Sequence, residues 1–62
     1  MPKFERRHYE AMAEDLRESK PNPKSRTVYA AWKSHVERVA NRFAADNPRF
    51  DRGRFMKAVR YP

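Results

Sequence analysis

The chain has 62 residues and a formal net charge of +7, because 15 lysines and arginines stand against 8 aspartates and glutamates. That length allows a single domain, which would bury only about 60% of the surface exposed by the unfolded chain, so a homodimer would enlarge a small core. Cysteine is absent, which excludes disulfide bridges, thiolate zinc sites and cysteine nucleophiles.

The first predicted helix covers residues 6–19. Its apolar residues recur at helical spacing and share one face: Tyr9, Met12, Ala13 and Leu16. Another face carries three acidic residues: Glu10, Glu14 and Glu18. We therefore expect Tyr9, Met12 and Leu16 in the core, and we interpret the glutamates as a solvated stripe.

Two prolines, Pro21 and Pro23, interrupt the helical pattern after the first helix. The second predicted helix covers residues 25–46. Either Asn22 or Ser25 could cap its first turn, and the sequence does not choose between them. Because the intervening loop is short, the first two helices should be antiparallel neighbours.

This second helix is the longest amphipathic segment, and the fold should be arranged around it. Its apolar residues form one stripe about 120° wide: Val28, Tyr29, Trp32, Val36, Val39, Ala40 and Phe43. We expect four of these residues to form the largest part of the core: Trp32, Val36, Val39 and Phe43. One flank of the stripe carries three groups that can bond outward: His35, Arg38 and Arg42.

The third predicted helix covers residues 51–60 and has a recognisable start. Asp51 is an N-cap candidate, and Phe50 and Phe55 have the spacing of a hydrophobic staple, so we assign all three a structural role. Gly53 in the first turn costs up to about 1 kcal/mol relative to alanine. The sequence thus predicts an all-α domain of three helices around the central amphipathic helix.

The junction of the second and third helices resembles a known sequence ending. Residues 46–55 read D-N-P-R-F-D-R-G-R-F and are similar to the D-N-P-R-F-D-R-x-R-F ending of many small proteins encoded by tailed phages and prophages. Tyr9 in the first helix and the alanines of the second fit the outline of that family. The resemblance implies a phage or prophage origin and the cytoplasm of a bacterial host, without an activity. Gly53 and the basic ending 57–62 depart from the pattern.

No residue pattern indicates catalysis. His8 and His35 each lie two residues from a glutamate, so neither pair has the i, i+4 spacing of a helical metal site. The single glycine excludes a glycine-rich phosphate loop. We expect no catalytic residues, no metal and no cofactor, and hence a protein that is not an enzyme.

Positive charge is concentrated after residue 19, and residues 20–42 carry six basic groups and one acidic group. Residues 49–62 carry five basic groups and one acidic group, whereas residues 1–19 carry four and five. The candidate partner-binding residues are His35, Arg38, Arg42, Arg49, Arg52, Arg54, Lys57 and Arg60. If the third helix folds back on the second, these residues could merge into one patch.

Two partners fit such a patch. The planar guanidinium group of arginine can make bidentate hydrogen bonds to phosphate and to carboxylate. The hypothesis that we favour is a nucleic-acid partner, and the alternative is an acidic surface of a host protein that the chain would modulate. A solvated surface that only keeps the protein soluble is the third interpretation. Tyr61 is the one ring expected to stay exposed, which disfavours stacking on single strands, and the third helix is short for a recognition helix.

Membrane association is disfavoured. No apolar run exceeds four residues, against the ~20 that a spanning helix needs, and the N-terminus lacks the apolar core of a signal peptide. The apolar stripe of the central helix should already be covered by the other helices. We expect a soluble protein that does not bind membranes.

Overall fold

The computed structural model describes residues 6–61 and contains three helices in that range. They are α1 (Arg6–Glu18), α2 (Arg26–Asp46) and α3 (Arg52–Val59). No strand occurs among these residues, so the predicted all-α class is confirmed. The predicted bounds 6–19, 25–46 and 51–60 differ from the observed ones by one residue at most of the helix ends, as expected for helices delimited by local signals.

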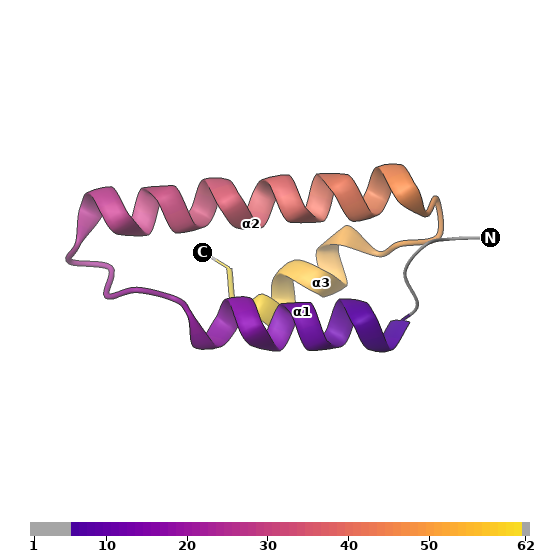
Figure 1. Ribbon diagram of the computed structural model, residues 1–62, viewed down its shortest axis with the longest axis horizontal. Coiled ribbons are helices and arrows are strands. Elements are labelled where there is room, and N and C mark those ends of the chain that lie inside the picture. The colour runs from indigo at the N-terminus through magenta and orange to yellow at the C-terminus, as the bar shows by residue number, and fades with distance from the viewer. Residues whose placement is uncertain (1–5, 62) are drawn as a thin grey trace.

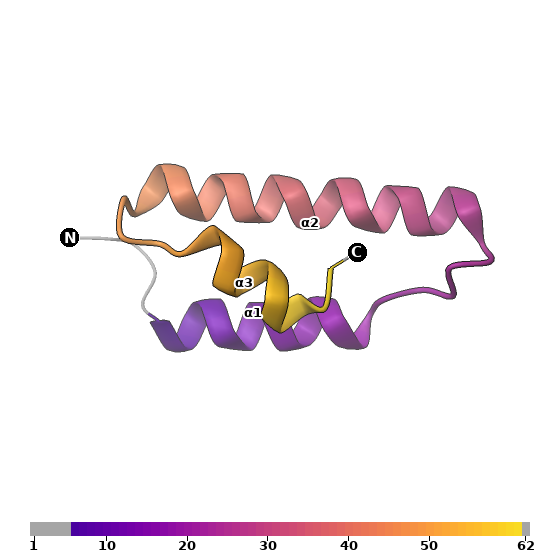
Figure 2. The same ribbon diagram turned by 180° about the vertical axis from the view of Figure 1, so that it is seen from behind.

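The molecule is elongated, with extents of 40 × 17 × 16 Å. Helices α1 and α2 run antiparallel along the long axis, and α3 lies against one side of this pair, between the two (Figure 1). Seen from behind, α3 stands in front of α1 and α2 (Figure 2). It packs on both of them, so the second helix is not the sole centre of the fold.

One apolar cluster draws on all three helices. Its buried members are Ala13, Leu16, Trp32, Val36, Ala40, Phe43, Phe55, Met56 and Val59. Three other predicted core residues, Tyr9, Val39 and Phe50, are half-buried and pack against this cluster. The ring of Phe43 lies 5.6 Å from that of Phe55 between centroids, so α2 and α3 meet through an edge-to-face aromatic contact.

Two apolar side chains predicted to face the core are exposed to different degrees. Val28 is 58% exposed because the first turns of α2 run beyond the ends of α1 and α3, where no helix covers it (Figure 1). Met12, predicted as a core residue, is 36% exposed. It precedes the buried Ala13 and is therefore turned about 100° away around α1, to the edge of the buried face.

The start of α3 has the predicted cap and staple. Asp51 lies at the N-cap in an extended conformation, and its Oδ1 accepts a hydrogen bond from the backbone N–H of Arg54 at 3.0 Å. The rings of Phe50 and Phe55 lie 5.4 Å apart between centroids. Asp51 therefore has a structural role at the helix start, although its side chain is exposed.

Neither candidate caps α2 with its side chain. Ser25 occupies the N-cap position, but its hydroxyl makes no capping hydrogen bond. The Oδ1 atom of Asn22 accepts instead from the backbone N–H of Lys24 at 3.0 Å, which closes a turn within the loop. Of the two alternatives left open by the sequence, Ser25 is therefore the N-cap residue, although without a side-chain hydrogen bond, and Asn22 is not.

Candidate anion-binding surface

All eight residues predicted to bind a partner have exposed side chains. They come from three parts of the fold. Helix α2 supplies His35, Arg38 and Arg42; the turn after it supplies Arg49; α3 and its C-cap supply Arg52, Arg54, Lys57 and Arg60. Exposure allows each of them to meet a partner, so the question is which of them share a face.

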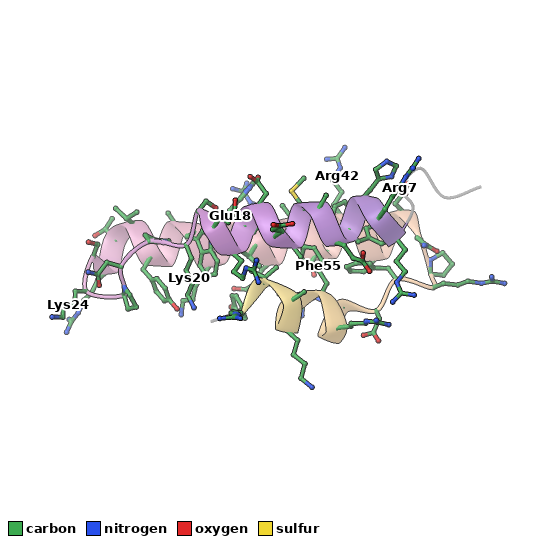
Figure 3. All side chains as sticks on the ribbon, turned by 90° about the horizontal axis from the view of Figure 1, so that it is seen from below. Arg7, Glu18, Lys20, Lys24, Arg42 and Phe55 are labelled. Atoms are coloured by element: carbon green, nitrogen blue, oxygen red, sulfur yellow. The ribbon has the colours of Figure 1, made fainter. Side chains whose placement is uncertain are left out.

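The structure does not merge these residues into one patch. Helix α3 packs on the flank of α2 that carries Glu37 and Asn41. The Tyr61 hydroxyl donates to Glu37 Oε2 at 2.7 Å, and Arg52 Nε donates to Asn41 Oδ1 at 3.2 Å. Arg42 points away from the side on which α3 lies (Figure 3). The expectation of a single basic surface is therefore wrong, because α3 docks on the other flank of α2.

Two basic surfaces result, and we name them by their helices. The α2 surface consists of His35, Arg38 and Arg42, which lie on the flank and outer side of α2. The α3 surface is centred on Arg54 and Lys57. These two residues project opposite to Phe55, Met56 and Val59, the buried face of α3. Arg42 and the outer side of α3 thus face opposite directions (Figure 3).

The cations at the centres of both surfaces lack acidic partners within residues 6–61. The one salt bridge in that range joins Arg6 Nε to Glu10 Oε1 at 3.1 Å, on α1. Arg38, Arg42, Arg54 and Lys57 take part in no ion pair among the described residues. Their charges therefore remain available to an external anion.

The arginines of α3 also oppose the local field of the helix. Arg52 and Arg54 lie in its first turn, which contains no acidic residue. The N-terminus of a helix carries a partial positive charge, and a cation there is unfavourable by about 0.3–1 kcal/mol at an exposed site. The Asp51 carboxylate at the N-cap offsets part of this cost. Helix stability therefore does not explain why arginines occupy these positions.

Some of the predicted residues have structural contacts. The bond from Arg52 to Asn41 holds its guanidinium across the α2–α3 contact. Arg60 ends α3 in a left-handed conformation, with φ 63°, and its backbone N–H bonds to the carbonyls of Lys57 and Met56. Arg49 donates its backbone N–H to Asn47 Oδ1 in the turn between the helices. These three are more firmly tied to the fold than Arg54 and Lys57.

Lys20 is a residue whose role the sequence did not reveal. Its ammonium donates to the Arg60 carbonyl at 2.8 Å, at the end of α3, and stands 5.6 Å from the centroid of the Trp32 ring. The position combines a favourable cation at a helix C-terminus with a cation–π contact. Because Lys20 and Arg60 are 40 residues apart, no local pattern could have paired them.

Tyr61 is not the freely exposed ring that the sequence predicts. It is half-buried and packs against the core, and its ring stacks on Trp32 with centroids 6.3 Å apart. The pKa of Tyr61 is raised, first because its hydroxyl is hydrogen-bonded to the Glu37 carboxylate, then by partial desolvation and by the negative charge of Glu37. This ring is therefore partly covered by the core, with its hydroxyl at the surface, and is not a free base-stacking platform.

The outer side of α1 has the opposite character. Glu10, Glu14 and Glu18 are all exposed, and the helix as a whole carries four acidic and three basic residues. Helix α1 thus has a small net negative charge, whereas α2 and α3 each have a net positive charge. A polyanion would be repelled from the first and attracted to the others.

Within residues 6–61 no group of three or more histidine, aspartate or glutamate side chains could hold a metal ion. No helix in the same range is long and apolar enough to cross a membrane. No protein-family model, curated protein or solved structure matches the chain. The exposed cations of α2 and α3 are therefore the feature that directs a functional interpretation.

Proposed function

We propose that the chain is a small non-enzymatic binding protein whose partner is a nucleic acid. The observation that carries this proposal is the α3 surface, where exposed cations have no acidic partner among the described residues and two arginines lie in the first turn of a helix. Cations in the first turn lower the stability of the free helix slightly, and all cations of the α3 surface gain favourable contacts when phosphates approach.

A duplex backbone fits this surface better than a base sequence. Double-stranded DNA presents about one negative charge per 1.7 Å of its axis, so a few cations one helical turn apart find phosphates in many registers. Helix α3 has eight residues and is therefore about 12 Å long, and within residues 6–61 every aromatic side chain, Tyr61 included, is at least half-buried. We infer phosphate contacts with little sequence preference.

The second candidate is an acidic surface of a host protein. Val28 is 58% exposed on α2, the helix that also carries Arg38 and Arg42. An apolar side chain together with arginines is typical of protein interfaces, in which a few anchors dominate the affinity. The resemblance to phage and prophage proteins leads us to propose a bacterial cytoplasm as the setting for either partner.

The nucleic-acid proposal is tested by titrating a fluorescent duplex with the protein at several salt concentrations. We expect log affinity to fall linearly with log salt, by about 0.9 units of slope for each phosphate contact. Arg54→Gln with Lys57→Gln should reduce that slope by up to about two units. Lys24→Gln with Arg26→Gln is the matched control, because it removes two exposed cations at the far end of the molecule.

Two results would reject the proposal. One is the absence of micromolar binding at low salt. The other is an equal loss of affinity in the control and in the α3 variant, which would indicate that affinity depends on the net charge of the protein and not on the α3 surface. In either case, a protein that is captured from nuclease-treated bacterial lysate, and released by Arg38→Gln with Arg42→Gln, would support the second candidate. Its binding should depend less steeply on salt.

A further inference from the structure

The two basic surfaces lie on opposite sides of a thin molecule. Arg42 of the α2 surface points away from α3 (Figure 3). Arg54 and Lys57 lie on the outer side of α3, opposite its buried residues. The smallest extent of the molecule is 16 Å. The major groove of B-DNA is about 12 Å wide, so a single duplex cannot enclose the molecule and touch both surfaces from its groove walls.

The side formed by α1 limits how a duplex can wrap from one surface to the other. Its exposed stripe of Glu10, Glu14 and Glu18 belongs to a helix whose four acidic residues outnumber its three arginines. A phosphate backbone that passes over this stripe meets like charges and is repelled. The two basic surfaces are therefore separated by a side of the molecule that does not favour a phosphate backbone.

We propose that the protein bridges two nucleic-acid duplexes, one held by the α2 surface and the other by the α3 surface. This inference rests on the proposed nucleic-acid binding and adds that a single molecule is bivalent. The occupant of each surface is the phosphate backbone of a duplex, because the cations at the centre of each surface lack an acidic partner within residues 6–61.

Bridging can be strong even when each surface binds weakly. Each one offers only two or three cations, so its own affinity depends on few phosphate contacts. Many molecules lying between two parallel duplexes act together, because the first bridge raises the effective concentration for the next. Their positive charge also screens the repulsion between the two backbones. We therefore expect bridging to appear at protein concentrations that cover the duplex densely.

The test uses one duplex immobilised on beads and a second, fluorescent duplex of unrelated sequence in solution. The fluorescence that the beads retain in the presence of protein measures bridging, and anisotropy measures binding to a single duplex. The wild type is compared with Arg38→Gln plus Arg42→Gln and with Arg54→Gln plus Lys57→Gln. Lys24→Gln plus Arg26→Gln serves as the control with the same charge loss, and circular dichroism confirms that each variant is folded.

The wild type and the control should retain the second duplex. Each surface variant should still bind one duplex but retain the second only at the protein-free background, because either loss leaves one site. Retention of the second duplex by either surface variant at the wild-type level would overturn the inference. The inference would also be overturned if the protein bridged duplexes as a dimer in which each copy uses only one surface. Wild-type binding without bridging would reject bivalency alone. No binding to any duplex would reject the proposed function.

Discussion

Trp32 joins three parts of the fold through one side chain. It belongs to α2, its Nε1–H donates to the Leu16 carbonyl of α1 at 3.0 Å, and its ring stacks on Tyr61 beyond α3. It is 7% exposed. Val28, one turn earlier on the same predicted stripe, makes no comparable contact and is exposed. Sequence periodicity predicts that both side chains are buried, whereas the packing of the other helices buries only Trp32.

We expect Trp32→Ala to lower the free energy of unfolding by about 3–5 kcal/mol, which is most of the stability available to a domain of this size. Val28→Ala should change it by less than about 0.5 kcal/mol, since the two methyl groups that it removes are largely exposed and contribute little. Urea denaturation followed by circular dichroism measures both. Comparable losses in the two variants would contradict the observed burial.

The hydrogen bond between Tyr61 and Glu37 predicts a dependence of stability on alkaline pH. Because the folded pKa of Tyr61 is raised above its unfolded value of about 10, the contribution is fully present below that value. It is lost as pH rises through the folded pKa. Glu37→Gln removes the carboxylate charge, so the pKa of Tyr61 should fall toward its ordinary value.

Tyrosinate absorbance followed during an alkaline titration measures this change. The difference between the wild type and Tyr61→Phe isolates Tyr61 from Tyr9 and Tyr29. The pH at which this difference appears should be lower in the Glu37→Gln background. An unchanged midpoint would show that the carboxylate does not act on the phenol in solution.

At the scale of the helices, local signals in the sequence were sufficient to predict that the three helices exist and where they begin and end. Pro21 and Pro23 separate α1 from α2, and Asp51 with Phe50 and Phe55 starts α3, because breakers, caps and staples act within a few residues. The side of α2 on which α3 docks is not a local property. The docking side determines whether the basic residues of α2 and α3 share one face. Helical periodicity in the sequence does not predict that side.

Arg54 and Lys57 provide a paired test of why cations lie on α3. Arg54 lies in the first turn, where the helix dipole disfavours a cation, and Lys57 lies in the last turn, where the dipole favours one. At low salt, Arg54→Gln should raise the free energy of unfolding by about 0.3–1 kcal/mol, and Lys57→Gln should lower it by a similar amount. Both variants should bind duplex more weakly than the wild type.

The opposite signs separate helix stability from binding. If Arg54 served the fold, its removal would lower both stability and affinity, as for Lys57. Thermal unfolding in nuclease-treated, nucleic-acid-free samples supplies the stability, and anisotropy supplies the affinity. Glutamine suits the comparison because its helix propensity is close to those of arginine and lysine. A loss of stability in Arg54→Gln would assign this arginine a structural role.

At the scale of the whole molecule, the three helices present different net charges to the solvent. Helix α1 has a small net negative charge, and α2 and α3 each present cations outward. Composition predicted the excess of positive charge, and the division of the chain predicted its concentration after residue 19. The separation into two opposed surfaces could not be predicted, nor could the contact of Lys20 with the end of α3, because both depend on the packing of residues distant in sequence.

This arrangement predicts how the stability of the free protein responds to salt. Repulsion among cations should outweigh attraction, since the net charge is +7 and the salt bridge between Arg6 and Glu10 is exposed, worth about 0.3–0.5 kcal/mol. Sodium chloride shortens the screening length from about 10 Å at 0.1 M to 3 Å at 1 M. The melting temperature should therefore rise with salt, and should rise less in Arg54→Gln with Arg38→Gln. A melting temperature that falls as salt is added would mean that attractive ion pairs dominate, and the surface cations would then have to be assigned to the fold.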